Sequence, residues 1–144
     1  VKLEMGAGKT DVAYLKTDDL KLQLGAGKTL FEKLEVSTNT TIDSGVGLLE
    51  ILDGTLNNLD LEAGVGKTDI KASILGESKI ECGVGSLDLY LIGSLESYKL
   101  NIEKGIGSIN VDDKIYSSDT LIGSGENLIK ISGGIGSINV KFKN

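Results

Sequence analysis

The sequence contains no histidine, tryptophan, proline or arginine, so its whole positive charge comes from lysine. The lack of histidine removes the usual general base near neutral pH and the commonest metal ligand. The lack of arginine removes the side chain best suited to bidentate contacts with phosphates and base edges. Because the net charge is also −6, we expect neither a nucleic-acid partner nor binding to an anionic membrane surface.

Paired cysteines and long apolar runs are absent as well. Cys82 is the single cysteine, so no internal disulfide can form. No apolar run approaches the roughly 20 residues of a membrane span, and no signal peptide is visible. Val1 nevertheless already occupies the first core position of a repeat. We therefore expect a fragment of a longer chain, in contact with a membrane only through a missing N-terminal segment.

A Gly-x-Gly phrase between two apolar segments recurs along the chain. The glycine pairs are Gly6 and Gly8, Gly25 and Gly27, Gly45 and Gly47, Gly64 and Gly66, Gly83 and Gly85, Gly105 and Gly107, and Gly134 and Gly136. Most pairs follow each other at about 19–20 residues, a period typical of solenoids. The sequence therefore predicts one all-β domain over 1–144, a parallel β-helix of about seven repeats with almost no helix.

Mostly apolar residues stand three and five positions before the leading glycines, and four and six after them, with threonine or serine at some of these positions. A spacing of two predicts a strand on each side of the pair, with one face inward. The residue between the glycines is also apolar, as in Val65, and is assigned to the inner face. We expect the second glycine to form a structural corner, since it tolerates positive φ. A looser return such as Leu34–Glu35–Val36 then leads to the next repeat.

The polar residues form columns in the same register. An acidic column precedes the glycines, as at Glu62 and Glu81, and lysines such as Lys67 follow them. A solvated face that keeps the protein in solution is favoured over a binding stripe. The acidic column could attract cations weakly, as a diffuse field and not as a metal site.

The last interval is longer than the others. The sequence predicts a loop-rich insertion at residues 112–127, which includes Tyr116–Ser117–Ser118–Asp119. We expect this insertion to cover the end of the stack as a cap. The chain then closes with Ile138–Asn139–Val140–Lys141–Phe142–Lys143–Asn144. We expect this segment to be the terminal edge strand, where lysines discourage end-to-end pairing.

Three features resemble chemical sites without meeting their requirements. The Gly-Lys-Thr phrases at 8–10, 27–29 and 66–68 lack the upstream glycine and the following helix of a phosphate-binding loop. The glycines do not follow the nine-residue spacing of calcium-binding β-rolls. Cys82 has no histidine or arginine nearby in the sequence to lower its pKa. We expect no catalytic residue, no cofactor and no metal site.

The chain resembles bacterial adhesin families of unknown function, which include head domains named for a Gly-Ile-Asn phrase and repeat domains of Gram-positive cell-envelope stress proteins. The matching segments are the Gly-Ala-Gly-Lys-Thr and Gly-Val-Gly-Lys-Thr-Asp-Ile phrases and the two Gly-Ile-Gly-Ser-Ile-Asn-Val phrases at 105–111 and 134–140. The resemblance implies a right-handed parallel β-helix displayed outside the membrane. It supplies no catalytic residues.

Three functional hypotheses follow. The first is a non-enzymatic structural or interaction module at the cell envelope or surface, with a protein or glycan partner that the sequence does not identify. The second is a self-assembling β-helical scaffold that stacks end to end through its open first repeat. The third is a carbohydrate-active enzyme, which requires converging carboxylates in a groove.

Overall fold

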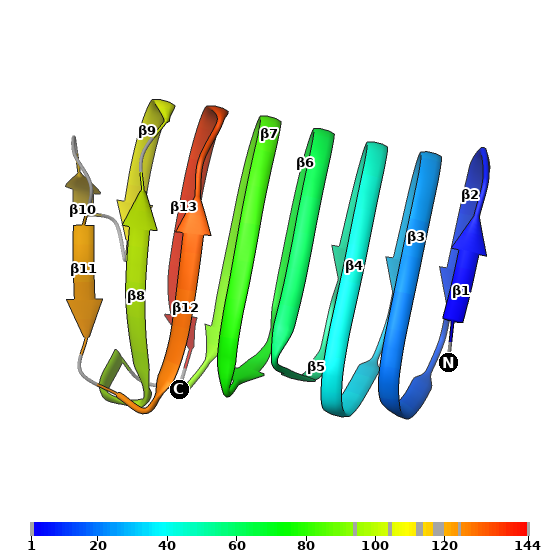
Figure 1. Ribbon diagram of the computed structural model, residues 1–144, viewed down its shortest axis with the longest axis horizontal. Helices are drawn as coiled ribbons and strands as arrows, with labels where there is room; N and C mark the ends of the chain where they lie inside the picture. Colours follow the sequence, from blue (N-terminus) through cyan, green and yellow to red (C-terminus); the bar gives the residue numbers. More distant parts are fainter. Residues whose placement is uncertain are drawn as a thin grey trace.

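The computed structural model describes residues 2–93, 95–103, 105–111, 114–116, 120–123 and 125–143, and it is almost entirely β-structure. Figure 1 shows the strands side by side, most of them parallel. The elements are β1 (Lys2–Met5), β2 (Gly8–Val12), β3 (Leu15–Phe31), β4 (Leu34–Ile51), β5 (Gly54–Asn57), β6 (Leu59–Leu75), β7 (Glu77–Ile92), η1 (Leu95–Ser97), β8 (Tyr98–Glu103), β9 (Ile106–Val111), β10 (Lys114–Tyr116), β11 (Thr120–Gly123), β12 (Asn127–Ser132) and β13 (Ile135–Lys143).

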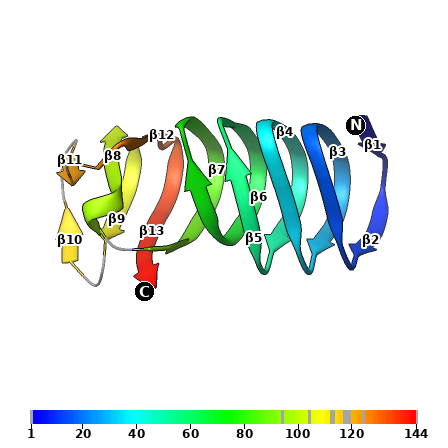
Figure 2. The same cartoon turned by 90° about the horizontal axis from the view of Figure 1, so that it is seen from below.

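Parallel pairing in register joins equivalent positions of successive segments. Leu22 of β3 pairs with Leu3 on one side and with Ile42 on the other. The long strands β3, β4, β6 and β7 each run through a glycine pair, and Figure 2 shows them curving around a common interior. The second glycine of each pair lies opposite a second glycine in the neighbouring parallel strand, as Gly47 does opposite Gly66. The repeat period of the sequence therefore determines which residues lie opposite one another in neighbouring strands.

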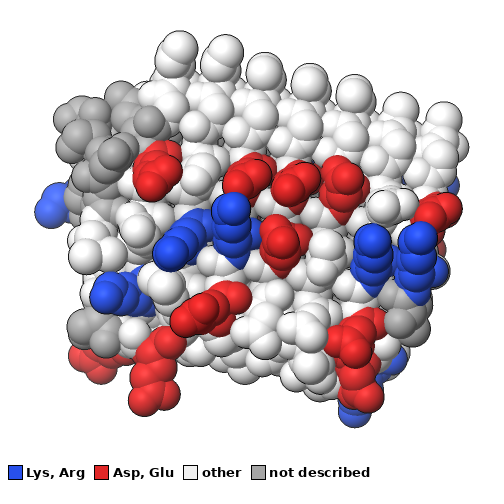
Figure 3. Space-filling model, in the orientation of Figure 1, with Lys and Arg blue, Asp and Glu red and all other residues white. Residues whose placement is uncertain are grey.

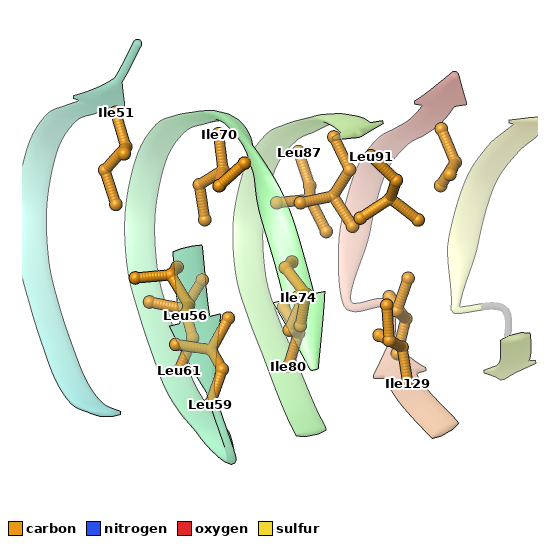
Figure 4. Close-up of a cluster of buried hydrophobic side chains, with 14 of the residues drawn as sticks. Ile51, Leu56, Leu59, Leu61, Ile70, Ile74, Ile80, Leu87, Leu91 and Ile129 are labelled. Carbon is orange, nitrogen blue, oxygen red and sulfur yellow. The ribbon is translucent and has the colours of Figure 1, made fainter. Parts of the chain in front are cut away.

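The interior is filled by ladders of aliphatic side chains. Figure 4 shows Ile70 on one side of the interior and Leu61 and Ile74 on the other, and all three are fully buried. Stacked aliphatics of this kind contribute roughly 1.5–3 kcal/mol each by burial. The expectation of looser returns is wrong, because Leu34 and Val36 are buried in β4 and pair with β3.

The residue between the two glycines points outward, which corrects the assignment of this position to the inner face. Val46, Val65 and Val84 are 57%, 52% and 49% exposed, and Ile106 and Ile135 are 72% and 54% exposed. The physical reason is the corner itself. Alternation of side chains fixes inside and outside along a straight strand, but the chain turns at each glycine pair and presents the intervening side chain at the apex.

The order of the last strands in space differs from their order in the chain. β12 pairs with β7 on one side and β8 on the other, and β13 likewise lies between β7 and β9. The predicted terminal edge strand is therefore an internal strand, and this prediction is wrong. This position gives the first part of β13 a paired strand on each side.

The predicted insertion at 112–127 contributes two short strands. β10 pairs antiparallel with β9, and β11 pairs antiparallel with β8, on the side away from β12 and β13. Residues 112–113, 117–119 and 124 of this segment, and Val1 at the other end, lie outside the described residues. Near the same end, Tyr98 is 1% exposed and donates a 2.8 Å hydrogen bond to the carbonyl of Ile92. Its ring lies with its centroid 5.8 Å from that of Phe142, and the two ring planes are tilted by 44°.

Candidate interaction surface

All seven glycine pairs lie along one edge of the molecule, where the chain turns between two faces. The second glycine of each pair has a φ between 114° and 141°, whereas the first does not adopt positive φ. At Gly66, with a φ of 131°, an added Cβ would also overlap the carbonyl of Gly47 in the neighbouring strand. The edge therefore combines a backbone conformation that favours glycine with a close approach of successive corners.

The side chains between the glycines form a continuous apolar ridge along this edge. In spatial order the ridge consists of Ala7, Ala26, Val46, Val65, Val84, Ile135 and Ile106. Seven positions at the spacing of paired strands extend over about 29 Å. Figure 3 shows that the corresponding upper edge carries no charged side chains. A contiguous row of exposed aliphatics is the kind of surface that marks an interaction site.

An acidic column borders the ridge on the face seen in Figure 3, two positions before each leading glycine. In spatial order it consists of Glu4, Gln23, Asp43, Glu62, Glu81, Ser132 and Glu103. Two of the carboxylates are paired on their own strands, Glu4 with Lys2 at 3.1 Å and Glu81 with Lys79 at 2.8 Å. No ion pair of Asp43 or Glu62 is found within the described ranges.

A lysine–serine column borders the ridge on the opposite face, three positions after each leading glycine. In spatial order it consists of Lys9, Lys28, Leu48, Lys67, Ser86, Ser137 and Ser108. Lys67 reaches diagonally to Asp88 at 3.5 Å. The ridge thus separates a row of negative charge from a row that is positive over one half of its length.

A ladder of polar side chains lies beyond the lysine–serine column. Asn110 donates to Asn139 at 2.9 Å, and Asn139 donates to Asp88 at 2.8 Å. The neighbouring Asp69 has a buried Oδ1 with no hydrogen-bond partner in the described part of the chain. Burial, and then the nearby Asp88, raise the pKa of the Asp69 carboxyl.

Tyr90 stands beside this ladder between two lysines. The ammonium groups of Lys71 and Lys141 lie 5.2 Å and 5.9 Å from its ring centroid. With Asp69 and Asp88, these residues line an open groove of about 540 Å³. Lys71 and Tyr90 pair through the regular register of β6 and β7, whereas Lys141 reaches Tyr90 only because β13 pairs with β7. The complete cluster was therefore not predicted from the repeat pattern.

The segments that resembled phosphate loops lie in strands. Lys9, Lys28 and Lys67 belong to β2, β3 and β6, and the only helical element of the described chain is η1. The helix N-terminus that a phosphate loop uses therefore does not follow any of them. Among the described residues, no three acidic or cysteine side chains are placed to hold a metal ion. The three segments instead lie in register along the lysine–serine column.

Cys82 is half-buried directly before Gly83, and burial raises the pKa of its thiol to about 11. A thiol with this pKa is a weak nucleophile at neutral pH. The sequence pattern predicts only a backbone role for the corner glycines. It does not predict that the side chains between them form an exposed ridge. The sequence feature that indicates the ridge is the apolar residue between the two glycines of every repeat, although its apolar character alone assigns it to the core.

The described residues contain no helix of the length and apolar character needed to cross a membrane. Comparisons with known protein families, with curated proteins and with solved structures found no match to this chain.

Proposed function

We propose that this chain is a non-enzymatic interaction module, built as a right-handed parallel β-helix of about seven repeats and related to the bacterial adhesin families that its sequence resembles. The observation that carries the proposal is the exposed apolar ridge. Val46, Val65 and Val84 are each about half exposed in the most regular part of the sheet. Aliphatics presented in a row along a rigid edge are suited to contact with another macromolecule.

The location we propose is the cell envelope or the cell surface. The support is the resemblance to envelope proteins together with the arrangement of the strands, which form a continuous stack (Figures 1 and 2) with exposed ridge side chains along one edge. A display or spacer function needs this stiffness and needs no catalytic group. The carbohydrate-active enzyme is less favoured, because the carboxylates of the groove are accompanied by lysines and Asp88 is already bonded to Asn139.

End-to-end assembly is the second candidate. Among the described strands, β1 and β2 pair only with β3, so one edge of each remains available. The opposite end is formed by β10 and β11, which run antiparallel to their neighbours. A second copy stacked there could not continue the parallel register, and this asymmetry disfavours an open-ended polymer.

The test is a binding assay with fluorescently labelled chain on intact bacterial cells and on isolated cell walls. The native protein is expected to bind in a saturable manner. The Val46→Ser/Val65→Ser/Val84→Ser variant should lose most of this binding and keep its fold, because all three side chains are exposed. Non-saturable binding on both surfaces, or equal binding of the variant, would contradict the proposal.

A further inference from the structure

We infer that the apolar ridge is an interface between two copies of this chain, which lie side by side with their stacks of strands parallel. The inference rests on the proposed function because it uses the same ridge, and it identifies the partner as a second copy of this chain. The ridge side chains Val46, Val65 and Val84 are 57%, 52% and 49% exposed. The aliphatic side chains four residues earlier on the same strands, Ile42, Leu61 and Ile80, are buried in the core.

The size of the ridge shows which residues must take part. A stable interface buries at least about 600 Å² on each partner. On a strip about 29 Å long, this area requires a width of about 20 Å, which corresponds to about six residues along each strand. Six residues reach from the acidic column to the lysine–serine column. Contact between two copies therefore includes both columns, and the charges of the columns decide the relative orientation.

Glycines on both sides of the ridge allow close contact. Each ridge residue is flanked by two residues without side chains, as Val65 is by Gly64 and Gly66. Two copies related by a two-fold axis along the stack can each place their ridge against the bare glycine strip of the other. Aliphatic side chains then pack against backbone, which excludes water from the centre of the contact.

A two-fold axis parallel to the stack brings each acidic column against the partner's lysine–serine column, layer by layer. Glu4 then faces Lys9 of the second copy, and Glu62 faces Lys67 of the second copy. No like charges meet in any layer. Exposed ion pairs contribute only about 0–1 kcal/mol each, so they select the orientation while the ridge supplies the area.

A two-fold axis perpendicular to the stack gives the opposite result. It places acidic columns against each other with the layers reversed, so that Glu4 meets Glu103, Asp43 meets Glu81, and Glu62 meets its own copy. Like charges directly opposite one another are destabilising. The same acidic column disfavours insertion of the ridge into an anionic lipid surface. Charge therefore favours the parallel pair of copies.

The first experiment is sedimentation velocity of the full chain over a wide concentration series. The native protein is expected to form dimers and no larger species. The Val46→Glu/Val65→Glu variant should raise the dimer Kd at least tenfold, since it places charge in the centre of the ridge. Ile115→Glu is the matched control, because Ile115 is 74% exposed but lies on β10, away from the ridge. It should leave the Kd unchanged.

The second experiment fixes the orientation by disulfide crosslinking. Cys82→Ser is made first, since the equivalent position of β4, two strands away, already carries Ser44. In the parallel pair Ala26 lies opposite Ala26 of the other copy, so an Ala26→Cys/Cys82→Ser protein should form a covalent dimer on oxidation. In the antiparallel pair Ala26 lies opposite Ile135. Crosslinking only in a mixture with an Ile135→Cys/Cys82→Ser protein would overturn the inference.

Three further outcomes have defined meanings. A native chain that stays monomeric throughout the series overturns the dimer, whether or not it binds cell walls, so the proposed module can survive this failure. Monomers that sediment with phosphatidylcholine vesicles would assign the ridge to lipid and also overturn the inference. A dimer that forms while cell-wall binding is absent would support the interface and contradict the envelope location.

Discussion

The side-chain amide of Asn139 donates a 2.8 Å hydrogen bond to the carboxylate of Asp88, which precedes it by 51 residues. On its other side, Asn139 accepts a 2.9 Å bond from Asn110. The three residues thus lie in the spatial order Asp88, Asn139, Asn110, although Asn110 comes before Asn139 in the chain. This order of hydrogen-bonded side chains results from the position of β13 between β7 and β9.

The insertion predicts slow hydrogen exchange along β13. Residues 135–140 of β13 have backbone partners on both sides, so their consecutive amides should be protected as well as those of β7. In an edge strand such as β2, alternate amides lack a partner and should exchange quickly. Hydrogen exchange followed by NMR or mass spectrometry makes the comparison. Alternating protection in β13 would show that the C-terminal segment is an edge strand.

The glycine edge predicts a graded series of stabilities. Gly6→Ala should be nearly neutral, because Gly6 does not adopt positive φ and an added Cβ meets nothing within 4 Å. Gly8→Ala should cost about 1–2 kcal/mol, since only its φ of 114° is unfavourable. Gly66→Val should cost more than either and can prevent folding, because it adds a steric overlap with Gly47.

Denaturant unfolding monitored by circular dichroism measures this series. Equal stability of the Gly66→Val and native proteins would show that the corner is placed at the wrong residue. Loss of stability in Gly6→Ala as large as in Gly8→Ala would instead show that positive φ is not the cause.

Asp69→Asn should stabilise the protein at neutral pH. Burial raises the native pKa of this carboxyl above its unfolded value, so the folded state binds the proton more tightly. The contribution of Asp69 to stability is therefore greatest at low pH and falls as the pH rises through the raised pKa. An amide removes the charge and can donate along the ladder, a gain of about 1 kcal/mol and about 3 °C in Tm.

Thermal unfolding at several pH values provides the measurement. The gain should be largest at neutral pH and should shrink under acidic conditions, where Asp69 of the native protein is protonated. Asp11→Asn is the control, because Asp11 occupies the position of β2 that is equivalent to Asp69 of β6, and Asp11 is exposed. A gain of equal size at both sites would attribute the effect to net charge and not to burial.

Cys82 should react slowly with thiol reagents in the folded protein. Because its pKa is about 11, the thiolate is scarce at pH 8, and reaction with a disulfide reagent should be about two orders of magnitude slower than in the unfolded chain. The Ala26→Cys/Cys82→Ser protein should react quickly at concentrations below the dimer Kd, where its thiol is exposed. Fast modification of native Cys82 would show that this position is more open than the structure indicates.

The sequence by itself determined the register of this protein. Glycine pairs at a spacing of about 19–20 residues, with aliphatics at fixed distances from them, can satisfy backbone hydrogen bonds and bury their side chains together only if equivalent positions pair. Leu22 between Leu3 and Ile42 is a direct result. The class of fold and the corner positions depend on this local pattern, which recurs in each repeat.

Two features were decided only by the tertiary structure. The segments 105–111 and 134–140 are identical in sequence, so local preferences cannot assign either one to the place beside β7, and contacts along the whole C-terminal segment decide it. The side chain between the glycines is apolar, as core residues are, yet Val65 points into solvent because the corner interrupts the alternation of the strand. Periodicity determines which residues pair with one another, whereas the path of the backbone determines which of them face the solvent.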